Sequence, residues 1–315
     1  MIMNHDITVS ILMPTYNHEK YISQAIESVL AQKTNYSYEL LIHDDCSTDG
    51  TLTIAKNYAT KYPDKIKLFT ETENQGLMKS YKQLIEQSNG KYLAILESDD
   101  YWLDENKLQI QIDFLDKNPD YGIVAGDIIT IDNKGKEIKK GGFNKDKEST
   151  DFWYTKLLGL SGLEGACTVI FRKDLFFKYC NINDYINFGF KTFDHPTWLS
   201  ISYHSKCRIL PKILAAYRHA STSLSNNIVF EKHMDFIFNI IEIEKYIIKK
   251  YGLNEITQDE YNNRIALMII GKALKFHKIK LFCEYTKRLK SPLSLKQKIM
   301  HFFPHLYYWQ FVLRH

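Results

Sequence analysis

Short apolar runs and helix-like segments alternate through the first hundred residues of this 315-residue chain. The runs at residues 7–13, 39–43, 66–69 and 92–96 predict strands, and apolar residues recur at helical spacing between them. Strands and helices that alternate at these lengths form right-handed βαβ units around a mostly parallel sheet. We therefore expect an α/β fold in which helices flank a mostly parallel central sheet.

Three of the predicted strands end in polar residues. Pro14-Thr15-Tyr16-Asn17 follows the first strand, Asp44-Asp45 the second and Asp99-Asp100 the run at 92–96. In open parallel sheets, ligands bind beyond the carboxyl ends of the strands. We expect these three segments, which are far apart in the sequence, to meet in one crevice.

The pair Asp99-Asp100 is the strongest indication of chemistry, because two carboxylates follow a buried apolar run. Burying unpaired carboxylates is costly unless a positive charge lies beside them. A divalent cation with oxygen ligands meets this need, and Mg²⁺ or Mn²⁺ commonly brings a substrate phosphate. The chain has neither G-x-G-x-x-G after its first strand nor G-x-x-x-x-G-K-[ST], so we expect metal and side chains to bind the phosphate.

Together these segments resemble glycosyltransferase family 2, whose members have the GT-A fold. The matching motifs are VSILMPTYN (9–17), DDCSTDG (44–50) and NQG (74–76), with Ser98-Asp99-Asp100 where the family has its D-x-D-type metal motif. The resemblance covers roughly residues 7–225, and the run DDYW with KLQIQ is similar to bacterial members that build surface polysaccharide. It implies an inverting, metal-dependent enzyme that uses Mn²⁺ or Mg²⁺ and a nucleotide-sugar donor, with a UDP-sugar expected.

The resemblance implies a nucleotide pocket at the end of the first strand. Its lining residues are Pro14, Thr15 and Tyr16. Asp45 is expected to accept a hydrogen bond from the uracil N3–H, because that donor needs an acceptor such as a carboxylate, and Asp44 is expected to shape the loop. A second interpretation is that Asp44 and Asp45 only form a turn before the next helix.

The same resemblance implies roles for the two later aspartates. Asp100 would bind the metal that bridges the two phosphates, and Asp99 would contact the ribose, or the metal through water. The metal would neutralise the charge that develops on the departing nucleoside diphosphate, which is a Lewis-acid role. The alternative is a solvated cap before the helix that begins near Glu105.

A third carboxylate lies in the second half of the chain. The segment KTFDHPTWL (191–199) is similar to the family's acceptor-side segment, in which an acid opens a helix. Asp194 is expected to be the general base, which takes the proton of the acceptor hydroxyl while that oxygen attacks the anomeric carbon and inverts it. Many family members have Glu-Asp here, and this chain has Phe193-Asp194. Alternatively, Asp194 only caps the helix, with Pro196 in its first turn.

Residues 217–225, YRHASTSLS, resemble a Y-R-x-H-x-x-S-x-S loop that closes over the diphosphate. Arg218 is expected to pair with a phosphate, and Ser223 and Ser225 also match. The usual histidine position is Ala220, and His219 lies one position early. The other interpretation of Arg218 is an ordinary surface ion pair.

Two other functions compete with glycosyl transfer. A sugar-phosphate nucleotidylyltransferase usually opens with a glycine-rich phosphate loop, which residues 14–17 do not form. An inactive binding module would not need intact Asp45, Asp100 and Asp194. We expect a hexosyl- or N-acetylhexosaminyltransferase that acts on a hydroxyl of a glycan or lipid-linked saccharide in surface polysaccharide biosynthesis.

The sheet rhythm stops near residue 228, after which apolar residues recur on one helical face. We predict a first helix through residue 248, a break at 254–257, and helices at 261–276 and 281–289. We divide the chain into a GT-A catalytic domain and a helical region through which copies of the chain could associate. The catalytic domain spans 1–225, with a nucleotide-sugar half at 1–130 and an acceptor half at 131–225, and the helical region spans 226–315.

The C-terminal tail is basic and aromatic, and it has no acid after Glu284. Basic residues followed by aromatics fit a helix on an anionic membrane surface, and packing against protein is the alternative. Five scattered cysteines without C-x-x-C and an N-terminus without a basic signal region fit the cytosol. We therefore expect a cytoplasmic protein, peripheral on the cytoplasmic face of the membrane. A net charge of +4 gives no argument for nucleic acid.

Overall fold

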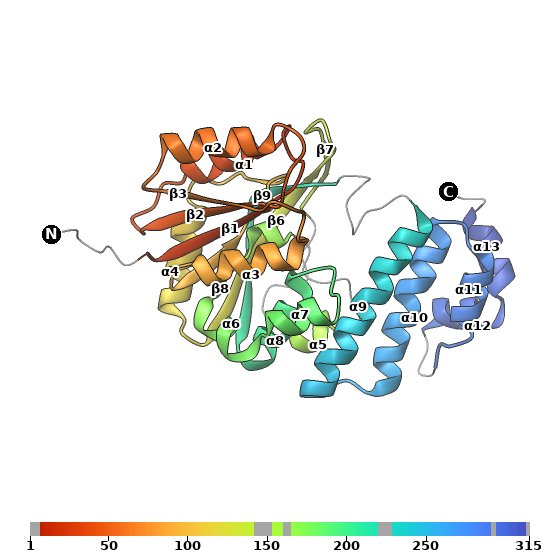
Figure 1. Cartoon of the computed structure of the whole chain (residues 1–315). Coiled ribbons are helices and arrows are strands. Elements are labelled where there is room, and N and C mark those ends of the chain that lie inside the picture. Colours follow the sequence, from red (N-terminus) through yellow and green to blue (C-terminus); the bar gives the residue numbers. More distant parts are fainter. Residues whose placement is uncertain (1–6, 142–152, 160–164, 220–228, 291–293, 313–315) are drawn as a thin grey trace.

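A sheet forms the centre of the part of the molecule that precedes the C-terminal helices (Figure 1). The computed structural model describes residues 7–141, 153–159, 165–219, 229–290 and 294–312. Within these residues nine strands form one sheet in the order β3-β2-β1-β4-β8-β6-β9-β5, and β7 pairs with β6.

The first four strands are parallel, as the alternation of strands and helices predicted. They are β1 (Val9–Thr15), β2 (Tyr38–Asp44), β3 (Ile66–Thr70) and β4 (Tyr92–Ile95). The register places Thr15 beside Asp44, so the polar residues that end β1 and β2 are neighbours.

The second half of the chain adds strands of both directions. β8 (Ile170–Arg172) runs antiparallel to both β4 and β6 (Tyr121–Ile131), and β9 (Lys206–Arg218) runs parallel to β6. β6 and β9 therefore point the same way as the first four strands. β5 (Tyr101–Trp102) is antiparallel to β9, and β7 (Glu137–Lys140) is antiparallel to β6. The β5–β9 pairing brings the end of β9 to the residues that follow β4.

Helices cover both faces of the sheet, and each face has its own apolar core. Because successive side chains of a strand point to opposite faces, Ile11 packs in one core and Leu12 in the other. One face carries α1 (Ile22–Leu30), α2 (Thr51–Lys61) and α4 (Lys107–Lys117). The other carries α3 (Leu77–Gln87), α6 (Lys173–Tyr179), α7 (Ile182–Asn187) and α8 (Asp194–His204).

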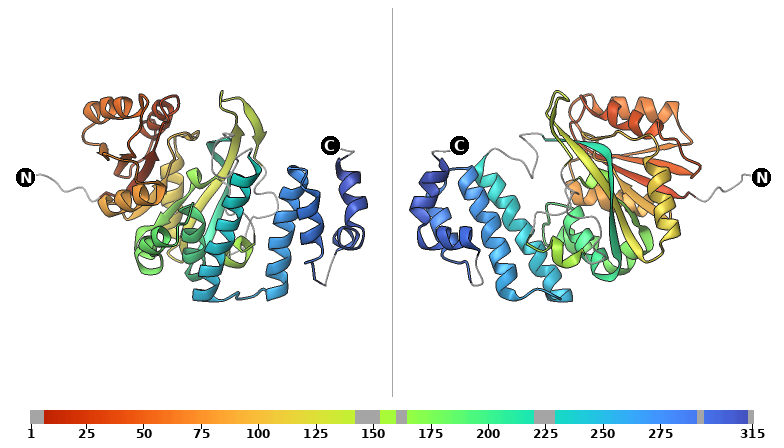
Figure 2. Two further views of the ribbon diagram at one scale, coloured as in Figure 1. Left: turned by 45° about the vertical axis from the view of Figure 1, so that its right-hand side comes forward. Right: turned by 180° about the vertical axis from the view of Figure 1, so that it is seen from behind.

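The C-terminal helices lie at the opposite end of the molecule from α1 and α2 (Figure 2). They are α9 (Phe230–Tyr251), α10 (Gln258–Lys275), α11 (Ile279–Thr286), α12 (Leu295–Phe302) and α13 (Pro304–Val312). The predicted break at 254–257 lies between α9 and α10. No helix in the described parts of the chain is long and apolar enough to cross a membrane.

The first C-terminal helix, α9, is part of the main core. Its residues Ile240, Ile243 and Ile247 are buried in the core on the α3 face of the sheet. The helices α10 to α13 share a separate apolar cluster around Phe282. The division of the chain into two domains at residue 226 stays a prediction.

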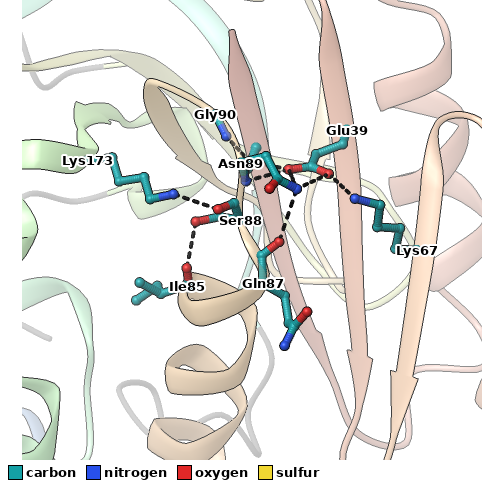
Figure 3. A network of polar contacts seen from close by, with 9 residues as sticks. Glu39, Lys67, Ile85, Gln87, Ser88, Asn89, Gly90 and Lys173 are labelled. Carbon is teal, nitrogen blue, oxygen red and sulfur yellow. Dashed lines mark hydrogen bonds and ion pairs between the residues drawn. The ribbon is translucent and has the colours of Figure 1, made fainter. Parts of the chain in front are cut away.

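A buried carboxylate, Glu39, connects several elements at the end of the sheet where β1 and β2 begin (Figure 3). Glu39 accepts hydrogen bonds from Ser10 Oγ, the Asn89 backbone N–H and Lys67 Nζ, each at 2.7 Å. The Gly90 N–H donates to Ser10 Oγ at 2.8 Å. Burial alone would raise the pKa of Glu39, but the bonds from Lys67, Ser10 and Asn89 outweigh burial and lower it. This network stabilises the sheet at the end remote from the polar strand ends.

Candidate functional site

The ends of β1 and β4 are joined by buried side chains. Ser98, just beyond β4, donates from Oγ to Thr15 Oγ1 at 2.7 Å, and its Oγ lies 2.7 Å from His18 Nδ1. Pro14 and Thr15 end β1 and are buried, whereas Tyr16 is 45% exposed. The residues predicted to line a nucleotide pocket therefore adjoin the segment that contains Asp99 and Asp100.

The two aspartates after β2 organise the neighbouring loops. Asp44 Oδ2 accepts the Ser47 backbone N–H at 3.0 Å, and its buried Oδ1 accepts no bond from any described residue. Asp45 Oδ1 and Oδ2 accept the backbone N–H groups of Gln75 and Gly76 at 2.6 and 2.8 Å. Asp45 thus joins the loop after β2 to the start of α3. Gly76 has a φ of +88°, a conformation that glycine adopts without strain.

Three carboxylates gather beyond the end of β4. Glu97, Asp99 and Asp100 each bring an oxygen atom to within 4.8 Å of the others. Burial, together with the charges of Asp99 and Asp194, raises the pKa of Glu97 to about 8. Burial also raises the pKa of Asp100 well above its usual range, with a contribution from Asp99. Like charges packed this closely favour a bound cation.

The two adjacent aspartates differ in their surroundings. Asp100 is 3% exposed, and its Oδ1 accepts the Arg218 backbone N–H at 2.7 Å. Asp99 is partly exposed. Asp100 is therefore already bonded to the protein through one carboxylate oxygen, whereas Asp99 is partly open to solvent.

Arg218 is buried, and its guanidinium binds protein oxygens. Its Nε and Nη1 donate to the backbone carbonyls of Asp99 and Asp132 at 2.8 and 2.9 Å, and Nη2 lies 3.4 Å from Gln24 Oε1. The guanidinium also lies over the Tyr21 ring, 4.2 Å from its centroid. These contacts exclude the surface ion-pair interpretation and make Arg218 a support of the Asp99-Asp100 loop.

Asp194 lies near this cluster, although it comes from the second half of the chain. It opens α8, and its Oδ1 accepts the His195 backbone N–H at 2.7 Å and the Thr192 hydroxyl. The Tyr81 hydroxyl of α3 donates to Glu97 Oε1 at 3.3 Å, and the Tyr81 ring stacks on Phe193 at 4.2 Å. Burial raises the pKa of Tyr81, as do the charges of Glu97 and Asp194.

Two residues of this site received no role from the sequence. Glu97 belongs to the Glu97-Ser98-Asp99-Asp100 run, and its spacing of two from Asp99 is the signal that could have identified it. In the sequence, Tyr81 occupies one apolar position of a predicted helix, and nothing there indicates its hydrogen bond to Glu97.

The loop predicted to close over the diphosphate lies only partly within the described residues. Ser223 and Ser225 are outside the described residues. The His219 backbone N–H donates to the Ile131 carbonyl at 2.8 Å and so extends the β6–β9 pairing.

The donor set of the cluster fits a hard divalent cation. Carboxylate oxygens are the ligands that Mg²⁺ and Mn²⁺ prefer. Burial, together with the charge of the neighbouring carboxylates, raises the pKa of Glu97 and of Asp100, and a bound cation would offset both effects. The oxygen donors of Glu97, Asp99 and Asp100 therefore suit Mg²⁺ or Mn²⁺.

Comparison with known proteins identifies a family and a fold. The model of the family "Glycosyl transferase family 2" matches residues 10–176. The Escherichia coli protein WfgD, a UDP-Glc:alpha-D-GlcNAc-diphosphoundecaprenol beta-1,3-glucosyltransferase, is 32% identical over 228 residues, which are 70% of this chain and 81% of WfgD. Mycobacterial relatives are 38% identical over 112 residues, which are about a third of their own length (32%).

Solved structures share the architecture at low sequence identity. TarS residues 1–349 of S. aureus in complex with UDP-GlcNAc superimpose with a TM-score of 0.59 and 18% identity, over 90% of this chain and 82% of that one. The mannosyltransferase PcManGT of Pyrobaculum calidifontis, with GDP-Man and Mn²⁺, gives a TM-score of 0.52 and 15% identity over 97% and 86% of the two chains. At these identities the likeness is one of fold.

Proposed function

Because the chain belongs to glycosyl transferase family 2 and has the GT-A fold, we propose that it transfers a sugar from a UDP-sugar to an acceptor hydroxyl with inversion. The acceptor is a glycan or lipid-linked saccharide of a surface polysaccharide, and the sugar is a hexose or N-acetylhexosamine. The observation that carries the proposal is the carboxylate cluster beside Asp194. WfgD, which is named for a UDP-glucose donor and a lipid-linked acceptor, supports the substrate classes.

On the donor side, the carboxylate cluster would bind Mn²⁺ or Mg²⁺. Asp100 stays our proposed metal ligand, because the Arg218 N–H occupies only one of its two carboxylate oxygens, and Asp99 and Glu97 offer further oxygens of the same cluster. Arg218 would keep the loop that carries Asp99 and Asp100 in shape. The bound ion supplies charge neutralisation for the departing diphosphate.

The nucleotide would lie along the ends of β1 and β2. Tyr16 offers an exposed ring, and the preceding residues Pro14 and Thr15 are buried at the end of β1. Asp45 stays our proposed acceptor for the uracil N3–H, because each of its oxygens accepts one backbone N–H and retains a second lone pair. Asp44 supports the loop through Ser47.

On the acceptor side, Asp194 is the proposed general base. Its Oδ1 already accepts two hydrogen bonds, whereas Oδ2 accepts none from the described residues and is available to the acceptor hydroxyl. The carboxylate takes the hydroxyl proton as the oxygen forms its bond to the anomeric carbon and the bond to the diphosphate breaks. Attack from the side opposite the leaving group inverts the anomeric centre.

A thermal-shift screen tests the donor class. We expect UDP-glucose or UDP-N-acetylglucosamine with Mn²⁺ to raise Tm, since a ligand at 100 times its Kd stabilises by about 2.7 kcal/mol. The shift should vanish with EDTA. Stabilisation by GDP-mannose and by no UDP-sugar would reject the donor assignment.

The far end of the molecule offers a surface for membrane contact. Phe302, Phe303 and Leu306 are 67%, 61% and 69% exposed, and exposed Lys296 and Lys298 lie on the same helix α12 as Phe302. These apolar side chains expose on the order of 400 Å², about half of the ~800 Å² per partner that a standard protein interface buries. We therefore favour peripheral contact with an anionic cytoplasmic leaflet over a stable dimer through these helices.

A further inference from the structure

A buried carboxylate of α9, Glu244, connects three segments behind the proposed base. Its Oε1 lies 3.0 Å from His195 Nε2 and accepts the Gly159 backbone N–H at 3.0 Å. Its Oε2 accepts the Tyr261 hydroxyl of α10 at 2.9 Å. Glu244 therefore binds the first turn of α8, the residues after α5 (Tyr154–Leu157) and α10 at once.

This network is fully enclosed. Glu244 is 0% exposed and His195 is 2% exposed. A buried carboxylate is costly unless hydrogen bonds satisfy it, and three donors from three segments do so here. Burial and the Glu244 charge raise the pKa of Tyr261, so its hydroxyl remains a donor. In the tautomer with its proton on Nε2, His195 donates to Glu244 Oε1.

The orientation of the His195 ring depends on Glu244. Its other ring nitrogen, Nδ1, is buried and has no hydrogen-bond partner among the described residues. The bond from Nε2 to Glu244 is therefore the polar contact that orients the ring. The backbone N–H of the same histidine donates to Asp194 Oδ1 at 2.7 Å. One residue thus links the base carboxylate to the C-terminal helices.

The acceptor half is also held by α10. Arg264 Nη1 donates to the carbonyl of Leu158 at 3.1 Å and to that of Thr155. Gly159 has a φ of +73°, and a Cβ there would lie 2.4 Å from Arg264 Cβ. Because only glycine fits this contact, α10 sits directly on the residues that Glu244 binds.

We infer that Glu244 is a positioning residue for the general base: acting through His195, it fixes the first turn of α8 and the Asp194 carboxylate. This inference rests on the proposed function. It assigns the C-terminal helices a part in catalysis through the positioning of the base.

The test compares Glu244→Gln with two other variants. Tyr261→Phe removes one bond of the network, and Glu242→Gln changes an exposed carboxylate of the same helix that pairs with Lys245. We measure kcat for release of UDP from UDP-glucose and UDP-N-acetylglucosamine with Mn²⁺, the Kd of UDP, and amide exchange at residues 193–197. Glu244→Gln should lower kcat about tenfold or more through misplacement of the base. UDP affinity should stay within about twofold, exchange should quicken, and Glu242→Gln should behave as wild type.

An unchanged kcat in folded Glu244→Gln would overturn the inference, as would an equal loss of UDP affinity and kcat. If Glu244→Gln does not fold, Tyr261→Phe replaces it in the test. A lower kcat with unchanged UDP affinity would then support the inference, and an unchanged kcat would overturn it. A wild-type protein that releases no UDP would reject the proposed function instead. In that case faster exchange at residues 193–197 in Glu244→Gln would support the positioning contact, and unchanged exchange would overturn it.

Discussion

Two carboxylates from different halves of the chain define the site at the scale of single residues. Glu97 follows β4 and Asp194 opens α8, yet the Asp194 charge contributes to the raised pKa of Glu97. Tyr81 lies between the two segments, with its hydroxyl on Glu97 and its ring on Phe193. The proposed leaving-group side and the proposed acceptor side therefore meet around one aromatic residue.

The role of Asp194 leads to a prediction about rate. Asp194→Asn keeps an oxygen for the His195 N–H but cannot take a proton, so kcat for UDP release should decrease by about 10²- to 10⁴-fold. The Kd of UDP, measured by calorimetry, should not change. Asp174→Asn is the control, because Asp174 is an exposed acid in the first turn of α6. Turnover near the wild-type rate in Asp194→Asn would show that another group is the base.

Local patterns predicted some of these residues and not others. Asp99-Asp100 and Asp194 stand out because an apolar run ends, or a helix begins, beside an acid. The contacts of Arg218 could not be predicted, because its bond to Asp100 joins residues 118 positions apart through the β5–β9 pairing. Burial of Asp100 likewise comes from a strand that the sequence does not place beside it.

At the scale of elements, Glu39 stabilises the end of the sheet where the strands begin, which is remote from the candidate site. The alternating pattern predicted β1 to β4, whose neighbours follow from βαβ connections. It did not predict the order of β5 to β9, because those pairings depend on contacts between distant segments. The Glu39 network joins β1, β2, β3 and the residues between α3 and β4.

Replacing Glu39 should change stability in a pH-dependent way. Glu39→Gln should lower the free energy of unfolding by about 2 kcal/mol at neutral pH, because charge-assisted bonds are lost. The folded-state pKa of Glu39 is lowered, so its stabilisation is present above the unfolded-state pKa and is lost as pH falls through the folded-state value. Denaturation with urea should therefore show the difference shrinking on acidification below pH 4.5, the ordinary value.

Exposed Glu86→Gln on α3 is the matched control and should stay within about 0.5 kcal/mol of wild type. If the difference in free energy of unfolding between wild type and Glu39→Gln stayed constant across the acidic range, the lowered pKa of Glu39 would be contradicted.

At the scale of the whole molecule, the C-terminal helices connect the proposed catalytic site to a distant apolar surface. Helical periodicity predicted α9, α10 and α11, but it does not identify the partner against which a buried helix face packs. The packing of α9 on the sheet core and the burial of Glu244 against His195 became visible only in three dimensions.

The exposed surface of α12 and α13 gives a prediction about membranes. The full chain should sediment with vesicles of phosphatidylcholine containing about one third phosphatidylglycerol, and less so at high salt. Changing both Phe302 and Phe303 to Ser should weaken binding at least about tenfold, because each ring buries apolar area. Phe177→Ser, at a ring of α6 that is 57% exposed, should have no effect. Equal binding by all variants would reject this surface.

The central claim is metal-assisted cleavage of a UDP-sugar at the carboxylate cluster. Its most direct test is release of UDP from UDP-glucose and UDP-N-acetylglucosamine, with Mn²⁺ and with EDTA, by wild type, Asp99→Asn, Asp100→Ala and the exposed control Asp64→Asn. We predict Mn²⁺-dependent release by wild type and Asp64→Asn, and a loss of about 10²-fold or more in both cluster variants. Release that is unaffected by EDTA or by either cluster substitution would contradict the account.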